Sequence, residues 1–287
     1  MPNDLSLSLQ ARLALEKAGF GFTRSLGQNF LFDEELLERI ARTGGADEGA
    51  NVLEIGPGAG MLTAIMARRG AKVLSVELDR SLESVLDTMT GGYENVRIVY
   101  ADALKIDLNR LTRDSFGGEA YVICANLPYY ITADFLLKAV TMKNAPAALT
   151  LMLQKEAAER VLAKQGEENW CALSAIVSYF CEGEIAFTVP REAFTPPPHV
   201  DSALITLRRR SERLVPPERE DEFVRFIKSA FSMRRKTLSN NLCSAYSIPK
   251  ARIAGTLENL QMDPRVRGEA LSLRELSRVF FALTGDV

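Results

Sequence analysis

The sequence predicts an α/β fold, a doubly wound sheet of the Rossmann-like type followed by a small all-α C-terminal domain. Three observations predict it. Short, almost wholly apolar segments alternate with helical stretches between residues 51 and 180, a glycine-rich turn follows the first of these segments, and residues 208–287 show helical periodicity without a strand pattern. Apolar strands that alternate with helices are typical of a parallel sheet covered by helices on both faces.

The expected strands and helices follow one another along the first two thirds of the chain. Strands are expected at residues 51–56, 71–78, 96–100, 121–125 and 148–153, with a closing pair at 184–189 and 203–207. Helices are expected over the run that ends at Arg69 and over residues 79–89, 132–142, 156–164 and 171–180. The proline-rich stretch 194–199 separates the two closing strands.

A change of composition after Leu207 marks a domain boundary, at the basic run 208–210 and the proline pair 216–217. Beyond it, helices are expected over residues 218–231, 234–245, 249–260 and 273–283. Pro249 suits a first-turn position, and Ser272 suits an N-cap. We therefore divide the chain into an N-terminal extension (residues 1–23), a main domain (residues 24–207) and a helical domain (residues 208–287).

The formal net charge of −2 hides an uneven distribution of charge. Residues 1–207 carry 19 Lys and Arg against 27 Asp and Glu, whereas residues 208–287 carry 16 against 10. An acidic body with a basic C-terminal piece suggests a polyanionic partner for that piece.

Composition also excludes several classes of protein. With 47% hydrophobic and 25% charged residues, the chain is neither disordered nor fibrous. It lacks a run of about 18 uncharged apolar residues and a secretory signal, so no membrane partner and a cytoplasmic location are expected. Four cysteines lie far apart and His199 is the single histidine, so neither a metal site nor a disulfide framework is expected.

The sharpest local feature is the turn Glu54-Ile55-Gly56-Pro57-Gly58-Ala59-Gly60, which ends the first strand and opens a helix. Glycines at such a turn let a ligand approach the backbone closely. Glu77 ends the second strand, where a carboxylate can accept hydrogen bonds from both hydroxyls of a ribose. Together these features predict a nucleoside cofactor without identifying it. No Gly-Lys-Ser/Thr follows, which excludes a triphosphate-binding P-loop.

Polar residues also follow the third and fourth expected strands. Asp102 follows the third, and because strand ends line the crevice of a doubly wound sheet, it can reach a second part of the cofactor, such as a purine amine. Taken alone, Asp102 fits equally well as a solvated cap of a helix. The fourth strand ends at Asn126-Leu127-Pro128-Tyr129.

The Asn-Leu-Pro-Tyr turn fits methyl transfer to an adenine amine, whose nitrogen is a poor nucleophile. The side-chain oxygen of Asn126 and a backbone carbonyl of Leu127 or Pro128 can accept both N–H hydrogens and stabilise positive charge as it develops on nitrogen. Tyr129 can stack on an extruded base. Such a mechanism needs no histidine base. The alternative is a simple turn with a buried tyrosine.

With these motifs the chain closely resembles the small-subunit (16S) ribosomal RNA adenine N6-dimethyltransferases, the family named for kasugamycin resistance. The resemblance spans roughly residues 24–245 and departs in a longer lead before Leu26 and in Ala101, where glycine is expected. Its motifs are Leu26-Gly27-Gln28-Asn29-Phe30-Leu31, the Glu54–Gly60 turn with Leu62-Thr63, Glu77-Leu78-Asp79, Asp102-Ala103, Asn126–Tyr129, Leu153–Glu156, Phe194–Ser202 and Phe231–Asn240.

The resemblance implies a class I S-adenosylmethionine-dependent methyltransferase, with S-adenosylhomocysteine as the product and no metal. Residues 24–207 would form the cofactor-binding domain, in which Glu77 would hold the ribose and Asp102 the cofactor's adenine amine. Phe194 would stack on the target base opposite Tyr129. The residues expected to contact the cofactor are Gln28, Asn29, Leu31, Gly56, Gly58, Glu77, Asp102, Ala103 and Asn126.

The implied substrate is a pair of adjacent adenosines near the 3′ end of small-subunit rRNA in a pre-ribosomal particle, each receiving two methyl groups from a monomeric enzyme. Residues 208–287 would bind RNA, with phosphate contacts from Arg208, Arg209, Arg234, Arg235 and Lys236. Three alternatives stay open: a large-subunit rRNA methyltransferase of the macrolide-resistance type, a mitochondrial transcription-factor relative, and an assembly factor whose RNA binding matters more than its catalysis. A nicotinamide dehydrogenase would leave the Asn-Leu-Pro-Tyr turn unexplained.

Overall fold

The computed structural model describes residues 5–21 and 29–285. The chain forms two compact units, one of residues 1–158 and 183–209 and the other of residues 159–182 and 210–287. The sequence places residues 159–182 in the main domain, whereas in the structure they belong to the helical unit. Within the described residues, no helix is both long enough and apolar enough to cross a membrane.

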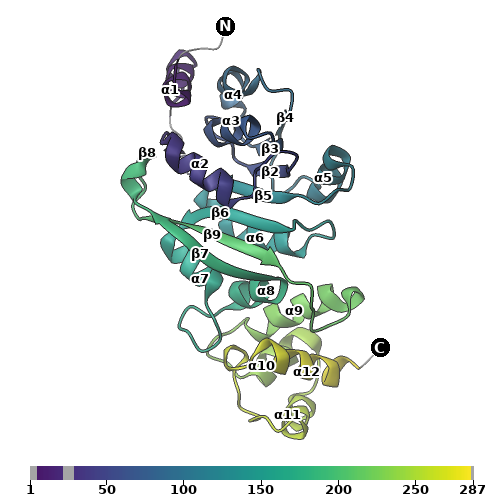
Figure 1. The fold of residues 1–287 in the computed structure, drawn as a ribbon. Coiled ribbons are helices and arrows are strands. Elements are labelled where there is room, and N and C mark those ends of the chain that lie inside the picture. Colours follow the sequence, from purple (N-terminus) through teal and green to yellow (C-terminus); the bar gives the residue numbers. More distant parts are fainter. Residues whose placement is uncertain (1–4, 22–28, 286–287) are drawn as a thin grey trace. The chain divides into compact units, whose positions relative to one another are not determined.

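A seven-stranded sheet forms the centre of the first unit, in the order β4-β3-β2-β5-β6-β9-β7 (Figure 1). Its strands are β2 (Asn51–Ile55), β3 (Lys72–Glu77), β4 (Val96–Tyr100), β5 (Val122–Asn126), β6 (Ala148–Gln154), β7 (Cys181–Val189) and β9 (Ser202–Arg209). The sequence predicts a parallel sheet with a closing pair of strands, and in the structure one strand of that pair, β9, runs antiparallel to β6. This direction is possible because β9 returns from β7 without a crossover helix.

The central strands are buried along nearly their whole length, as parallel strands between helical layers should be. Every residue of β2 is buried, and in β3 only the first residue, Lys72, is exposed. Val52 and Leu53 of β2 pair in parallel with Val73 and Leu74 of β3. The sheet therefore brings the residues that follow β2, β3, β4 and β5 to one edge.

Six helices accompany the first five strands of this sheet: α1 (Leu7–Lys17), α2 (Glu34–Thr43), α3 (Met61–Arg68), α4 (Glu83–Thr90), α5 (Leu108–Phe116) and α6 (Thr132–Thr141). The sequence analysis did not include α2 or α5, although each has an aspartate N-cap, Asp33 and Asp107, whose side chain accepts a backbone N–H. Helix α1 buries Leu7, Ala11 and Leu15 and contacts α3 and α4. It is therefore part of the first unit rather than a separate extension.

A short two-stranded ladder, also absent from the sequence analysis, joins the beginning of the chain to the proline-rich loop. In it β1 (Phe30–Leu31) pairs antiparallel with β8 (Phe194–Thr195), with Leu31 opposite Phe194. Two residues of each strand give too little periodic pattern to be recognised in a sequence. The ladder holds the segment around Asn29 beside the sheet.

The second unit is helical, as expected. Its helices are α8 (Ala172–Phe180), α9 (Glu220–Ala230), α10 (Leu238–Tyr246), α11 (Lys250–Asn259) and α12 (Leu273–Thr284), and α7 (Lys155–Leu162) connects the two units in sequence. Ser272 caps α12 in a capping box with Glu275, as the sequence predicted for the cap. Pro249 is the N-cap of α11 rather than a first-turn residue.

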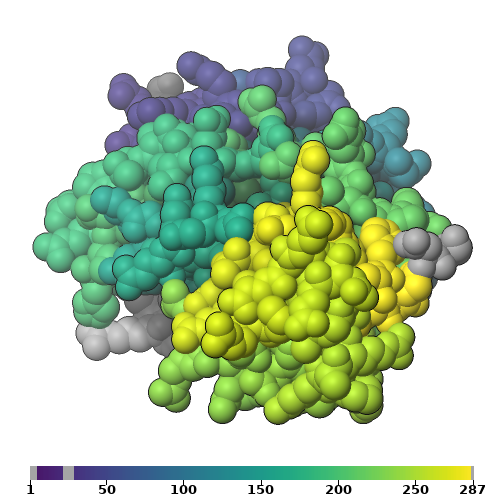
Figure 2. All heavy atoms as spheres, turned by 90° about the horizontal axis from the view of Figure 1, so that it is seen from below, coloured from purple at the N-terminus to yellow at the C-terminus, as the bar shows by residue number. Residues whose placement is uncertain are grey.

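Aromatic rings form the core of this unit. Figure 2 shows one outer face, where residues near the C-terminus are coloured lime to yellow. Phe223 and Phe280 are fully buried, with ring centroids 5.3 Å apart. The ring centroid of Tyr179 in α8 lies 5.3 Å from that of Phe223, and the Tyr179 hydroxyl donates a hydrogen bond to Oε1 of Glu220 at 3.2 Å. These contacts explain why α8 belongs with the C-terminal helices, because its apolar face completes their core.

Candidate active site

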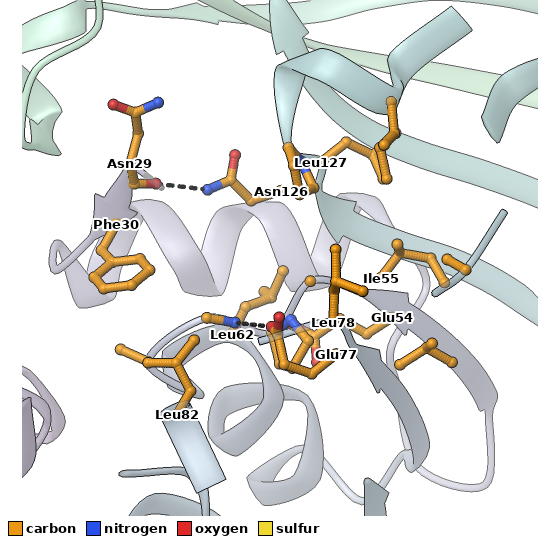
Figure 3. A pocket seen from close by; sticks show the side chains of 18 of the residues that line it. Asn29, Phe30, Glu54, Ile55, Leu62, Glu77, Leu78, Leu82, Asn126 and Leu127 are labelled. Carbon is orange, nitrogen blue, oxygen red and sulfur yellow. Dashed lines mark hydrogen bonds between the residues drawn. The ribbon is translucent and has the colours of Figure 1, made fainter. Parts of the chain in front are cut away.

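A pocket lies in the first unit where β2, β3, β4 and β5 end (Figure 3). It is lined by residues of the glycine-rich turn, of the three following strand ends and of the segment around β1. Of the residues that the sequence assigns to cofactor or substrate, those lining it are Asn29, Leu31, Gly56, Gly58, Glu77, Asp102, Ala103, Asn126, Leu127, Pro128 and Tyr129.

Two glycines of the turn have conformations and neighbours that exclude a side chain. Gly56 has a φ of 68°, and a Cβ there would lie 3.1 Å from Cδ of Pro128. Gly58 has a φ of 58°, and a Cβ there would lie 2.9 Å from the ring of Phe30. The glycines thus let the Asn-Leu-Pro-Tyr turn and the β1 segment approach the cofactor turn.

Glu77 connects the end of β3 to this turn. Its Oε2 accepts a hydrogen bond from the backbone N–H of Gly58 at 3.3 Å, drawn as a dashed line in Figure 3, and its Oε1 accepts one from Asp79 at 2.7 Å. Burial raises the pKa of Glu77, and the two backbone hydrogen bonds act in the opposite direction. The carboxylate is held in place and still has lone pairs for a ligand hydroxyl.

Asp102 lies at the start of the loop that follows β4. Its Oδ1 accepts a hydrogen bond from the backbone N–H of Leu104 at 2.9 Å, and its Oδ2 lies 3.2 Å from Nζ of Lys105. The hydrogen bond from Leu104 lowers the pKa of Asp102, and the positive charges of Lys105 and Lys138 lower it further. Asp102 is therefore an ionised acceptor at the pocket.

The side-chain amide of Asn126 has a defined orientation. Nδ2 donates a hydrogen bond to the backbone carbonyl of Asn29 at 3.2 Å (Figure 3). Among the described residues this is the only hydrogen bond of the side chain, so Oδ1 is the end of the amide with unused acceptor capacity.

Tyr129 follows in the 3₁₀ helix η3 (Tyr129–Ile131), and its hydroxyl shares a hydrogen bond with Ser202 at 2.7 Å. Burial raises the pKa of Tyr129, so the phenol stays neutral. The hydrogen bond fixes the ring at the pocket wall.

Glu54 also lines the pocket, and the sequence analysis gave it no role. It is fully buried, and its Oε2 accepts hydrogen bonds from the hydroxyls of Thr63 at 2.6 Å and Ser75 at 2.7 Å. Burial raises the pKa of Glu54 to about 7, and the nearby charge of Glu77 adds to this effect. A glutamate within an otherwise apolar strand was the signal in the sequence, because a buried carboxyl group needs hydrogen-bond donors.

Apolar walls complete the pocket, and the sequence analysis did not assign them. Leu78, Leu82 and Tyr130 line it. The side chains of Leu78 and Tyr130 are 45% and 51% exposed, so both offer apolar surface to a ligand. Each directly follows a residue of an identified motif, Glu77 or Tyr129, which could have drawn attention to it.

The other residues that the sequence assigns to the site are not among those that line the pocket. Gln28 is outside the described residues. Phe194 is only 2% exposed, belongs to the hydrophobic cluster that includes Phe30 and Leu31 of β1, and is not among the pocket's lining residues. Arg208 and Arg209 lie on β9 of the first unit, whereas Arg234, Arg235 and Lys236 are exposed in the second.

The residues present fit a nucleoside cofactor of the S-adenosylmethionine type. Glu77 and Asp102 are carboxylate acceptors at the ends of neighbouring strands, suited to hydroxyl and amine hydrogens. Leu78, Leu82 and Ile131 provide the apolar surface that a purine ring requires. Together with the Asn-Leu-Pro-Tyr turn at the pocket wall, the glycine turn and the paired acceptors fit a class I S-adenosylmethionine-dependent methyltransferase.

Comparison with known proteins identifies the family. The family model for ribosomal RNA adenine dimethylase matches residues 19–275, and the chain belongs to this family. A ribosomal RNA small subunit methyltransferase A from Geobacillus sp. (strain WCH70) is 39% identical over 287 residues, which cover 99% of each chain. The protein of the same name from Enterococcus faecalis is 42% identical over 274 residues, covering 94% of this chain and 92% of that one.

Solved structures agree with this assignment. A dimethyladenosine transferase from Plasmodium falciparum is 26% identical, with a TM-score of 0.72, and the match covers 89% of this chain and 97% of that one. The 23S rRNA methyltransferase ErmE is 27% identical, with a TM-score of 0.65, covering 89% of this chain and 100% of that one. The resemblance, the fold class and the enzyme class, an S-adenosylmethionine-dependent rRNA adenine methyltransferase, are thereby confirmed.

Proposed function

We propose that this enzyme transfers methyl groups from S-adenosylmethionine to N6 of two adjacent adenosines near the 3′ end of small-subunit rRNA, giving N6,N6-dimethyladenosines. The observation that carries the proposal is the oriented amide of Asn126, whose Nδ2 is bound to the carbonyl of Asn29 at the wall of a pocket that contains Glu77 and Asp102. The relatives named as small subunit methyltransferases support small-subunit rRNA as the substrate.

Glu77 binds the ribose hydroxyls of the cofactor, and Asp102 binds its adenine amine. The bound cofactor supplies a methyl group made electrophilic by the sulfonium. Gly56 and Gly58 bring the backbone of the turn close to the ligand. Asn29, Leu31 and Ala103 complete the walls, and the reaction leaves S-adenosylhomocysteine in the same pocket without a metal.

The acceptor half of the site increases the reactivity of the adenine nitrogen. Asn126 Oδ1 and a carbonyl of the Leu127–Pro128 turn accept the two N6 hydrogens, so positive charge that develops on nitrogen is stabilised in the transition state. The N–C bond forms as the S–C bond of the sulfonium breaks, and the methylated nitrogen then releases a proton to water. The ring of Tyr129, held by Ser202, stacks on the extruded base. A stacking role for Phe194 requires its ring to leave the hydrophobic cluster that it shares with Phe30 and Leu31 when RNA binds.

The helical unit provides the contacts to RNA phosphates. Arg235 and Lys236 are exposed and form no ion pair with other described residues, so both are free for phosphate. Arg234 is already bound, to the Glu269 carboxylate at 2.9 Å and to the carbonyl of Glu168 at 2.8 Å. The substrate is the rRNA within a pre-ribosomal particle in the cytoplasm, and the enzyme acts as a monomer.

A competition assay tests the choice of substrate. Unmethylated small and large ribosomal subunits are mixed in equal amounts with the enzyme and labelled S-adenosylmethionine, and each rRNA is then separated and counted. We expect the label in small-subunit rRNA and none above background with Asn126→Ala. Label in large-subunit rRNA would favour the macrolide-resistance type instead. Tight binding to small subunits without any label would favour an assembly factor.

A further inference from the structure

Lys138 of α6 forms three hydrogen bonds to a single loop. Its Nζ donates to the backbone carbonyl oxygens of Ala103 at 2.9 Å, Leu104 at 2.9 Å and Ile106 at 2.7 Å. An ammonium group has three hydrogens, so its whole donor capacity is directed at this loop. The loop is the one that begins with Asp102 and lines the pocket.

Among the described residues, the other hydrogen bonds within this loop run from its backbone N–H groups to Asp102. Asp102 Oδ1 accepts from Leu104, and the Asp102 carbonyl accepts from the backbone N–H groups of Lys105 at 3.0 Å and Ile106 at 2.9 Å. These bonds are all internal to the loop. Lys138 connects the loop to a helix, because it lies in the last turn of α6, where its sequence neighbours Ala139 and Val140 are buried.

Helix α6 is also continuous with the acceptor turn. Asn126 ends β5, the 3₁₀ helix η3 follows at Tyr129–Ile131, and α6 begins at Thr132. Lys138 therefore connects the element that carries the methyl-acceptor turn to the loop that carries Asp102, the two halves of the site.

The charges of Lys138 and Asp102 also stabilise each other's ionised form. Burial lowers the pKa of Lys138, while the charges of Asp102 and Asp107 oppose that shift and favour the ammonium form. Lys138 in turn helps to keep the pKa of Asp102 low, together with Lys105. Both aspartates that favour the ammonium form lie at this loop: Asp102 begins it, and Asp107, the N-cap of α5, follows it.

We propose that Lys138 is a positioning residue that sets the enzyme's selectivity for the adenine end of its cofactor, by holding the loop 102–106 so that Asp102 presents its carboxylate to the pocket. The inference rests on the proposed role of Asp102. Selectivity requires a rigid loop because it depends on the fixed position of the Asp102 carboxylate. An amine at the purine 6-position donates a hydrogen bond to this carboxylate, whereas a carbonyl oxygen at that position is itself an acceptor and cannot.

The test compares two ligands. S-adenosylhomocysteine and S-inosylhomocysteine differ at the purine 6-position, which bears an amine in the first and an oxygen in the second. Calorimetry gives both dissociation constants for the wild type, Lys138→Met, Lys138→Arg and Asp102→Asn. Lys143→Met, an exposed lysine just beyond α6, is the matched control. Methionine is one heavy atom shorter than lysine, keeps an unbranched, flexible side chain and has no donors.

In Lys138→Met we expect binding of S-adenosylhomocysteine to weaken at least tenfold, while binding of S-inosylhomocysteine changes less than twofold, so that the preference for adenine falls. Lys138→Arg should recover part of it, and Lys143→Met should leave it unchanged. At saturating S-adenosylmethionine, kcat should stay within about twofold. Amide hydrogen exchange should become faster at Leu104, Lys105 and Ile106, whose N–H groups bind Asp102.

Three results would overturn the inference. Lys138 would have only a structural role if Lys138→Met weakened the binding of both ligands equally while Asp102→Asn removed the preference for adenine. Unchanged exchange in the loop would show that Lys138 does not order it. A full preference for adenine in Asp102→Asn would instead refute the proposed role of Asp102, and the selectivity role of Lys138 with it, even if exchange in the loop increases.

Discussion

The side-chain Nδ2 of Asn126 lies 3.2 Å from the backbone carbonyl oxygen of Asn29 and donates a hydrogen bond to it. The two residues are far apart in the sequence, and the pairing of β1 with β8 helps to hold Asn29 in place. This bond decides which end of the amide is available. If the amide were reversed, two oxygens would face each other at Asn29, so the N-terminal segment orients the acceptor that the reaction uses.

Replacing Asn126 tests this relationship. We expect Asn126→Ala to lower kcat by about 100- to 1000-fold, the loss found when one stabilising group of a transition state is removed. Binding of rRNA should persist, because the charged residues remain. Single-turnover methyl transfer and filter binding measure the two effects, and Asn259→Ala, at the exposed end of α11, is the control. Wild-type turnover in Asn126→Ala would remove Asn126 from the mechanism.

Replacing Glu77 tests the cofactor half of the site. In Glu77→Gln the charge-assisted hydrogen bonds to the ribose hydroxyls are lost, and we expect the affinity for S-adenosylhomocysteine to fall at least tenfold, about 1.4 kcal/mol. Calorimetry measures it directly. Glu83→Gln makes the same charge change at an exposed position of α4 and should leave affinity unchanged. Equal affinities in the two variants would contradict the assignment.

The basic residues 234–236 of the second unit, here called the basic turn, predict that RNA binding depends on salt concentration. Arg235→Ala and Lys236→Ala should each weaken RNA binding and reduce the slope of log K against log salt by about 1, because one phosphate contact is lost. Arg234→Ala should reduce it less, since Glu269 already pairs with that arginine. Arg110→Ala, an exposed arginine of α5, is the control. A slope that does not change would assign the turn to a face that does not contact RNA.

Glu54 predicts a pH dependence of stability. Burial raises its pKa from 4.5 to about 7, so the folded protein favours the neutral carboxyl group. That contribution is fully present below about pH 4.5 and is lost as the pH rises through about 7. At about 1.4 kcal/mol per pKa unit, the loss amounts to at most about 3.5 kcal/mol.

Glu54→Gln removes this titration while keeping an acceptor for Thr63 and Ser75. The free energy of unfolding of the wild type relative to Glu54→Gln should therefore fall between pH 5 and pH 8.5, as measured by urea titration. Glu83→Gln should show no such change relative to the wild type. A constant difference between wild type and Glu54→Gln across this range would mean that Glu54 is already ionised at the lower pH.

The parts of the site that were predictable are those with a local signal. The glycine turn, Glu77, Asp102 and the Asn126–Tyr129 turn each follow an apolar strand, and the ends of such strands meet at one edge of the sheet. Their convergence in one pocket therefore follows from the fold class alone.

The other parts depend on contacts between distant segments. The β1–β8 ladder has two residues in each strand, and nothing near Phe194 in the sequence shows that its ring is buried. The grouping of α8 with the C-terminal helices rests on the packing of Tyr179 against Phe223. The three bonds of Lys138 likewise join a helix to a loop more than 30 positions earlier.

The central claim is that this enzyme dimethylates two adjacent adenosines of small-subunit rRNA. The most direct measurement is to incubate it with S-adenosylmethionine and unmethylated small subunits, digest the rRNA, and locate the modified nucleosides by mass spectrometry. We predict N6,N6-dimethyladenosine at two adjacent positions near the 3′ end. Unmodified adenosines there, together with methyl groups on large-subunit rRNA treated in parallel, would contradict the account.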